Sequence, residues 1–185
     1  MTPGTLLISQ PFLGDPNFER SVVLVCRDAS ASGTFGLVLN RPTELLLSDV
    51  LTLPLGLAAP AAALPLFAGG PVEPDTLHYL HRRPDVPGAA ALGDGVYWGG
   101  EFAVLLELLG TGALAAADVR LFVGYAGWGP GQLAAERQAR SWVTHPASAG
   151  KVFTLATDAF WREILREKGG RFQAWANYPV DPRLN

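Results

Sequence analysis

The stretch of sequence that decides the fold is Gly124-Tyr125-Ala126-Gly127-Trp128-Gly129-Pro130-Gly131-Gln132-Leu133. The apolar, partly β-branched run Val119–Tyr125 leads into it and predicts a strand. Pro130 stands where a helix can begin, and Gly131–Arg140 continues with good helix formers. The stretch therefore predicts a strand, a tight glycine turn and a helix in direct succession.

This turn has two interpretations. A helix N-terminus presents free backbone N–H groups and the positive end of a dipole, so Gly127–Gln132 could bind an anion. However, Pro130 has no N–H, and no lysine or arginine lies between Arg120 and Arg137. The alternative is a structural corner, in which glycines adopt unusual dihedral angles and Trp128 packs into a groove. We favour the structural corner.

Outward from this stretch, short apolar segments and helical patterns cover most of the chain. Strands are predicted at Thr5–Ser9, Ser21–Cys26, Thr34–Asn40, Leu66–Ala68, Thr76–His81, Val96–Trp98 and Ser141–Thr144. Helices are predicted at Thr43–Val50, Glu101–Leu109 and Asp158–Lys168, the last capped by Asp158, and the tail Phe172–Asn185 is expected to pack on the body. Strands outnumber helices without alternating with them regularly. The pattern predicts an α+β fold with a mixed, largely antiparallel sheet and flanking helices, in a single domain over residues 1–185.

The composition limits the classes of protein to consider. The 185 residues are 49% hydrophobic and 17% charged, which suits a packed core and argues against a disordered chain. The formal net charge is −3, whereas binding to a phosphate backbone needs clustered lysine and arginine. We therefore expect no direct nucleic-acid binding, although a mildly acidic chain can still carry a local basic patch.

Three features predict a cytoplasmic protein without a membrane segment. Cys26 is the single cysteine, so no intramolecular disulfide can form, and its apolar surroundings favour a buried small side chain over a reactive thiol. The N-terminal run Met1–Ser9 lacks the basic region of a signal peptide. The uncharged run Val50–Gly70 is long enough to span a bilayer, but three prolines interrupt it, so we interpret it as a connection lying on the protein.

The usual catalytic motifs are absent from the sequence. There is no Gly-x-Ser-x-Gly, no Gly-x-x-x-x-Gly-Lys-Ser/Thr and no Gly-x-Gly-x-x-Gly. The nitrogen and sulfur ligands for zinc are limited to His78, His81, His145 and Cys26, and the first two lie on opposite faces of a predicted strand. We therefore assign no catalytic residue, no metal and no cofactor.

Candidate ligand-binding residues are polar or glycine residues at strand ends, together with two residues of the glycine corner. Functional loops concentrate at such positions. The eight candidates are Arg20, Asn40, Arg41, Gly69, Gly70, His81, Trp128 and Glu136. A purely structural alternative exists for each kind: a salt bridge for Arg20, a solvated strand end for His81-Arg82-Arg83, and packing for Trp128.

Five blocks, taken in order, resemble the AlgH/YqgE family of bacterial proteins. They are Gly4–Pro11 with Asp15 and Phe18; Arg20–Cys26; Gly36–Pro42; Gly69–Val72 with Leu80-His81; and Gly124–Leu133 with Glu136 and Trp142. The ending Tyr178–Asn185 is also similar to the family. The resemblance implies an α+β, cytosolic protein whose biochemical function is not established, and some members carry the label of transcriptional regulator.

The sequence departs from the family pattern in the helix after the corner. Ala134 stands where an acidic residue is common, and Arg140 stands where an asparagine is common. Glu136 alone remains of a possible carboxylate pair, and we expect it to pair with Arg140 four residues further on.

We consider three functions. The first is a non-enzymatic binding or regulatory module whose partner is an unknown small molecule or protein, with the oligomeric state left open. The second is an enzyme in which Arg20, Asn40, Arg41, His81 and Glu136 converge on one pocket. Direct regulation through DNA ranks last, because no basic recognition helix is apparent.

Overall fold

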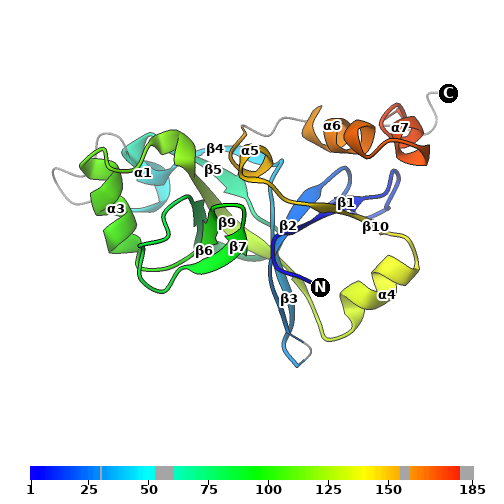
Figure 1. Cartoon of the computed structure of the whole chain (residues 1–185), viewed down its shortest axis with the longest axis horizontal. Helices are drawn as coiled ribbons and strands as arrows, with labels where there is room; N and C mark the ends of the chain where they lie inside the picture. The colour runs from blue at the N-terminus through cyan, green and yellow to red at the C-terminus, as the bar shows by residue number, and fades with distance from the viewer. Residues whose placement is uncertain (30, 53–60, 155–158, 180–185) are drawn as a thin grey trace.

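The computed structural model describes residues 1–29, 31–52, 61–154 and 159–179. A ten-stranded sheet runs in the order β10-β1-β2-β3-β9-β6-β8-β7, and β4 and β5 join it through a pairing of β5 with β9 (Figure 1). Every pairing within the described residues is antiparallel except β5 with β9. This confirms the α+β fold with a mixed, largely antiparallel sheet.

The element bounds agree with most of the predicted segments. The strands are β1 Thr5–Ser9, β2 Val22–Ala29, β3 Gly33–Val38, β4 Pro42–Leu46, β5 Pro65–Ala68, β6 Val72–His81, β7 Ala90–Gly93, β8 Val96–Trp98, β9 Val119–Trp128 and β10 Trp142–Pro146. The helices are α1 Leu47–Val50, α3 Phe102–Gly110, α4 Gln132–Gln138, α5 Ala149–Phe153, α6 Ala159–Lys168 and α7 Arg171–Trp175, with a 3₁₀ turn at Ala116–Asp118.

Strand β9 connects the two halves of the sheet. Its first half, Leu121–Val123, pairs in parallel with β5, and its second half, Ala126–Trp128, pairs with β3 on the same edge. The chain changes partner at Gly69, whose N–H donates to Val123 O (2.8 Å) and whose C=O accepts from Val38 N–H (2.8 Å). The fold-deciding stretch is therefore the shared strand of both halves.

The glycines at this switch are required by close backbone approach. A Cβ on Gly69 would lie 2.2 Å from Gly124 O, and one on Gly70 would lie 2.2 Å from Tyr125 O. Gly124 itself has φ +67°, a region that favours glycine. Gly69 and Gly70, predicted as ligand-binding residues, thus have a structural reason for being glycine.

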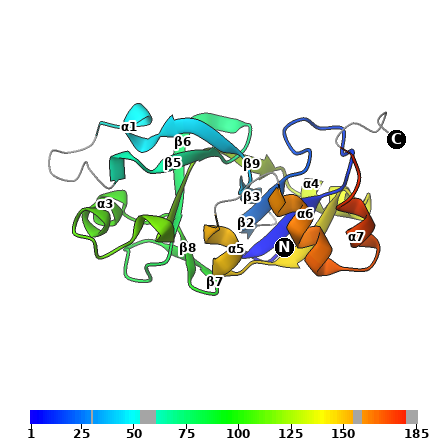
Figure 2. The same ribbon diagram turned by 90° about the horizontal axis from the view of Figure 1, so that it is seen from above.

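Among the described residues, three apolar clusters stabilise the sheet. Leu6 and Ile8 of β1 face the cluster that includes Trp161 of α6, whereas Leu7 faces the cluster beneath α4. This alternation follows from the two-residue period of a strand. A third cluster holds α3 on the far half of the sheet, and Figure 2 shows α3 at the opposite end of the molecule from α6 and α7.

Cys26 lies in the first of these clusters and is 3% exposed, and burial raises the pKa of its thiol. The prediction of a buried small side chain is confirmed.

Some predictions about local structure were wrong. Thr43–Val50 is not one helix: it is mostly strand β4, which pairs with β5, followed by the single turn α1. Leu45 and Leu46 are exposed there and only Leu47 is buried. The strand Ala90–Gly93 was not predicted, because its four residues carry no clear alternation.

Several predictions fall on parts of the chain outside the described residues. These include the cap at Asp158, residues 53–60 of the alanine–proline run, and residues 180–185 of the tail. Among the helices of the described residues, none combines the length and the apolar composition needed to cross a bilayer.

Candidate functional site

The corner after β9 is closed by side chains. Gly131 precedes α4 with φ +78°, and the Gln132 side chain accepts a hydrogen bond from the Gly129 N–H (3.0 Å). The Gln132 N–H, which is one of the free N–H groups expected at a helix start, donates to Gly129 O (3.1 Å) and is therefore occupied from within the chain. This geometry agrees with the structural corner rather than with an anion-binding loop.

Glu136 fastens α4 to the sheet through two tryptophans. Its Oε2 accepts hydrogen bonds from the indole Nε1–H of Trp128 (2.9 Å) and of Trp142 (2.7 Å). Its Oε1 accepts from Gln132 Nε2 (2.9 Å). The ion pair expected between Glu136 and Arg140 is absent from the described residues; Arg140 lies just beyond the helix with φ +64°.

A cavity of about 250 Å³ lies beside this carboxylate, and we term it the indole pocket. It is lined by Leu13, Asp15, Phe18, Gly127, Trp128, Gln132, Glu136, Ser141 and Trp142. The Phe18 ring stacks on Trp128 (centroids 5.8 Å apart) and meets Trp142 edge-on (5.6 Å). The pocket thus combines three aromatic rings with the carboxylates of Asp15 and Glu136, and its lining includes no lysine or arginine.

Arg41 and Gly70 line a different cavity, of about 160 Å³, at the ends of β3 and β5. Arg41 Nη2 donates to the carbonyl oxygens of Glu19 (2.9 Å) and Pro16 (3.2 Å). These bonds tie the loop before β2 to the sheet. One nitrogen of the guanidinium is thus bonded to backbone, and this structural role accounts for the residue.

Asn40 and Arg20 also hold backbone. Asn40 Oδ1 accepts from Val22 N–H (2.8 Å), and its Nδ2 donates to Arg20 O (2.8 Å). Arg20 donates to the carbonyls of Tyr178 and Pro179 and lies 5.1 Å from the centroid of the Trp161 ring. Burial, followed by the nearby Arg162 charge, lowers the pKa of Arg20. The expected salt bridge is replaced by bonds to the C-terminal segment.

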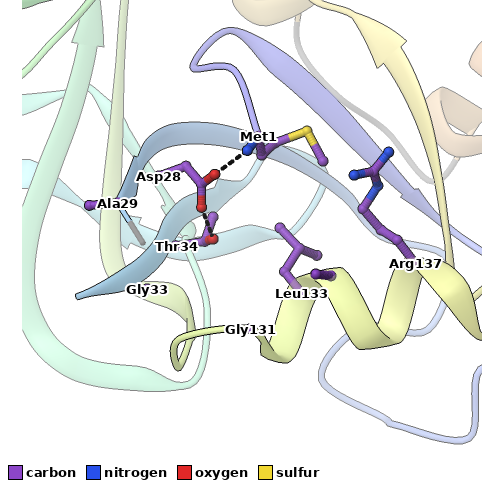
Figure 3. A pocket seen from close by; sticks show the side chains of 9 residues that line it. Met1, Asp28, Ala29, Gly33, Thr34, Gly131, Leu133 and Arg137 are labelled. Atoms are coloured by element: carbon purple, nitrogen blue, oxygen red, sulfur yellow. Dashed lines mark hydrogen bonds and ion pairs between the residues drawn. The ribbon is translucent and has the colours of Figure 1, made fainter. Parts of the chain in front are cut away.

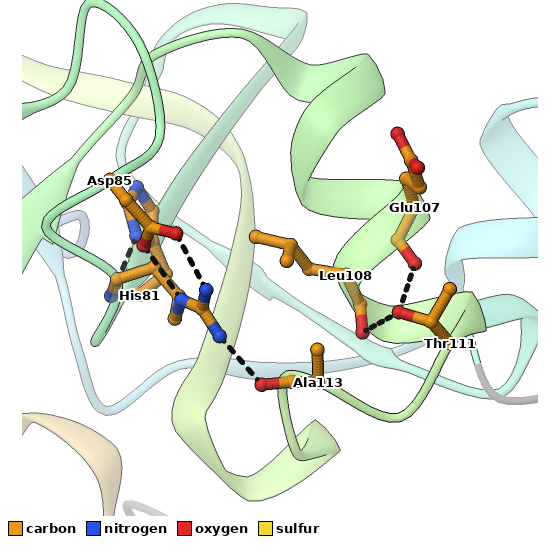
Figure 4. Close-up of polar contacts among 7 residues, drawn as sticks. His81, Asp85, Glu107, Leu108, Thr111 and Ala113 are labelled. Carbon is orange, nitrogen blue, oxygen red and sulfur yellow. Dashed lines mark hydrogen bonds and ion pairs between the residues drawn. The ribbon is translucent and has the colours of Figure 1, made fainter.

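His81 is fully buried and both of its ring nitrogens are engaged. Nε2 lies 2.9 Å from Gly99 O, and Nδ1 accepts from Arg83 N–H (3.2 Å), which fixes the tautomer that carries the proton on Nε2. Burial lowers the pKa of His81. Figure 4 shows the ring beside Asp85, in the half of the sheet that carries α3. His81 is therefore closed to solvent-borne ligands.

The predicted site residues consequently lie in separate places. Trp128 and Glu136 share the indole pocket, Arg41 and Gly70 line the strand-end cavity, and His81 is buried elsewhere. The convergence on which the enzyme hypothesis depended is not formed by these side chains. Within the described part of the chain, no three His, Cys, Asp or Glu side chains lie together as metal ligands.

A further cavity, of about 160 Å³, lies beside the N-terminus (Figure 3). Its carboxylate, Asp28, is bonded to the Met1 ammonium and to the Thr34 hydroxyl, and these contacts lower the pKa of Asp28. Figure 3 also shows Arg137 rising from α4 apart from this pair. The charge of Asp28 is thus already compensated.

Seven of the nine residues that line the indole pocket were not predicted as site residues, among them Asp15, Phe18 and Trp142. A usable signal was present, because Trp128, Gln132 and Glu136 are spaced by four residues, which places Gln132 and Glu136 on one face of the helix. The contribution of Phe18 depends on a loop more than one hundred residues away in sequence, so local patterns could not reveal it.

Comparison with known proteins gives a consistent picture. Residues 6–173 match the AlgH-like family, DUF179. UPF0301 proteins of Cytophaga hutchinsonii (40% identity, all of both chains) and Chlorobaculum tepidum (40%, all of this chain and 96% of that one) are similar over the whole length.

Solved structures agree with this. The solution structure of AlgH from Pseudomonas aeruginosa has a TM-score of 0.74 at 27% identity, covering 96% of this chain and 94% of that one. A crystal structure of a Corynebacterium diphtheriae protein shares the fold, with a TM-score of 0.76 at 23% identity over 96% and 93% of the two chains. The chain belongs to the AlgH-like family.

Proposed function

We propose that this protein is a non-enzymatic binding module whose indole pocket receives an organic cation, such as the ammonium of a metabolite or a side chain of a partner protein. The observation that carries the proposal is the lining of the pocket: three aromatic rings and two carboxylates, with no cationic side chain. Aromatic faces attract cations, most strongly where water is displaced. The ligand would supply the positive charge that the pocket lacks.

The pocket is also held in shape before any ligand arrives. Glu136 fixes both indoles, and the Asp15 carboxylate accepts the Asn17 N–H (2.9 Å), which orients it. A pre-formed site loses little conformational entropy on binding. The same hydrogen bonds explain the packing of α4, so the site and the fold share one set of contacts.

The wider setting is part of the same proposal. We propose one domain, because β9 contributes to both halves of the sheet, and a cytoplasmic location, because the single cysteine is free and buried. A regulatory role would follow from occupancy of the pocket rather than from contact with duplex DNA.

Calorimetric titration with choline tests the proposal, with 3,3-dimethylbutanol as the uncharged isostere. Choline should bind and the isostere should not. Asp15→Asn keeps the acceptor for Asn17 and removes the charge, so it should weaken choline binding roughly fivefold, which corresponds to about 1 kcal/mol. The matched control Glu107→Gln lies on α3 and should bind as the wild type does. Equal heats for choline and its isostere would reject the proposal.

A further inference from the structure

Strand β10 forms one end of the sheet and has a free edge. It pairs with β1 in antiparallel register, with Leu7 opposite Thr144, and no other strand of the described residues pairs with it. An unpaired edge presents backbone N–H and C=O groups that can bind another chain.

The hydrogen bonds of the β1–β10 ladder show which backbone groups of β10 face outwards. Gln10 N–H donates to Ser141 O (2.9 Å), so residues at every second position from Ser141 bond to β1. The alternate residues, Trp142 and Thr144, therefore direct their backbone N–H and C=O away from β1. One of these groups is engaged, since Thr144 O accepts from Lys168 Nζ (2.9 Å).

The outer edge opens into a groove, which we term the basic groove. Figure 1 shows β10 passing between α4 on one side and α6 and α7 on the other. The groove has a volume of about 340 Å³ and is lined by Arg137, Arg140, Trp142, Val143, Thr144, Lys168, Arg171, Phe172 and Trp175. The edge strand thus forms part of a cavity wall rather than being covered.

The groove gathers positive charge on a chain whose formal net charge is −3. Four cations line it, Arg137, Arg140, Lys168 and Arg171, and no carboxylate is part of the lining. None of the carboxylates that the structure describes forms an ion pair with these four side chains. Unpaired like charges held together favour an anionic partner.

Aromatic rings fill the space between the cations. Lys168 Nζ lies 5.2 Å from the centroid of the Phe172 ring, and the Arg171 guanidinium lies 4.9 Å from it. Trp175 meets Phe172 edge-on at 5.2 Å and is half-buried. The floor therefore offers apolar contacts beside Lys168 and Arg171.

We propose that the basic groove binds an acidic, extended peptide segment of a partner protein, which adds a strand to the outer edge of β10. Backbone groups facing outwards at strand spacing are satisfied by another peptide. Asp or Glu side chains on both faces of the added strand would reach the two pairs of cations, Arg137 with Arg140 and Lys168 with Arg171. A second copy of this chain would bring four more cations to the edge, so charge repulsion opposes self-pairing. The groove shares Trp142 with the indole pocket and is otherwise lined by different residues, and the proposal does not depend on a ligand in that pocket.

Fluorescence anisotropy tests this mode of binding with a labelled peptide of about ten residues, in which pairs of glutamates alternate with pairs of valines so that both faces of the strand carry glutamate. Two comparison peptides are needed: one with the same charges but N-methylated at alternate amides, and one with lysine in place of glutamate. Only the unmodified peptide of glutamate and valine should bind tightly.

Variants of the protein separate the backbone contribution from the charge contribution. Thr144→Pro removes an outward N–H while leaving the ladder with β1 intact, since proline is tolerated on edge strands. It should weaken binding about tenfold without changing the cations. The double variant Arg140→Glu and Arg171→Glu should abolish binding, whereas the control Arg166→Glu, exposed on α6 outside the groove lining, should retain it.

Two results would overturn the proposal. One is equal affinity for the N-methylated peptide. The other is that a single-stranded oligonucleotide of equal charge binds more tightly than the peptide and that Thr144→Pro does not change its affinity. That result would make the groove a site for polyanions in general. If Thr144→Pro fails to fold, the N-methylated peptide on the wild-type protein decides the matter. Choline binding is measured independently, so failure here and failure at the indole pocket are distinguishable.

Discussion

Replacing Glu136 by leucine tests whether one carboxylate holds α4 on the sheet. The change leaves the indole N–H groups of Trp128 and Trp142 without their acceptor, and both tryptophans are about 95% buried. A buried donor left unpaired costs about 1–2 kcal/mol when water can partly replace its partner. Two such donors predict a loss of about 2–4 kcal/mol in the free energy of unfolding.

Urea unfolding followed by far-ultraviolet circular dichroism measures this loss, and in thermal unfolding it corresponds to a decrease of roughly 5–15 °C in Tm. Glu136→Gln keeps one acceptor oxygen and should lose about half as much. Glu163→Gln, an exposed carboxylate on α6, is the control and should change stability by less than about 0.5 kcal/mol. If Glu136→Leu also stayed within about 0.5 kcal/mol of the wild type, the reasoning would be refuted.

Three further predictions concern other parts of the fold. The pKa of buried His81 lies below its ordinary value, so the unfolded chain takes up a proton first and the free energy of unfolding should fall as the pH drops below about 6.5. His81→Gln should reduce the dependence of this free energy on pH, measured by urea titrations at several pH values. An unchanged dependence would contradict the assignment. Gly69→Ala places a Cβ 2.2 Å from Gly124 O and should destabilise the fold by about 3 kcal/mol or more. Gly150→Ala in α5 meets only Ser148 Oγ at 4.0 Å, an ordinary contact, and should stabilise by up to about 1 kcal/mol. The same sign for both changes would be inconsistent with the close-approach argument. Arg120 is buried and donates to Val152 O (2.8 Å) and Leu39 O (2.6 Å), and its Nε has no partner within the described residues. Arg120→Lys replaces the two donating guanidinium nitrogens by one ammonium and should lower the free energy of unfolding by about 1–3 kcal/mol. Exposed Arg166→Lys is the control.

The sequence predicted those parts of the fold whose cause is local. Strand β1 and helices α3 and α6 follow from apolar periodicity, and the corner after Trp128 follows from its glycines and Pro130. Thr43–Val50 failed because β4 is stabilised by pairing with β5, a contact that its leucine-rich pattern does not encode. The roles of Gly69 and Gly70 were hidden for the same reason, since the backbone they approach is more than fifty residues away.

The candidate sites show the same limit. Trp128 and Glu136 were predicted from one short segment and do share a pocket. The basic groove was missed because Arg137 lies in α4 and Arg140 just after it, whereas Lys168 and Arg171 come about thirty residues later. The sequence allowed for a local basic patch without locating it, since only the packing of α4, α6 and α7 around β10 brings the four cations together.

The most direct test of the central claim is an amide-edited NMR titration of the indole N–H resonances with choline. The chain has five tryptophans, and only Trp128 and Trp142 donate their indole N–H to Glu136 in the indole pocket. The binding proposal predicts that choline shifts these two resonances and leaves those of the other three tryptophans unchanged. It also predicts that 3,3-dimethylbutanol shifts none of the five. Shifts spread over all five indoles, or none at the two pocket indoles with choline at a large excess, would contradict it.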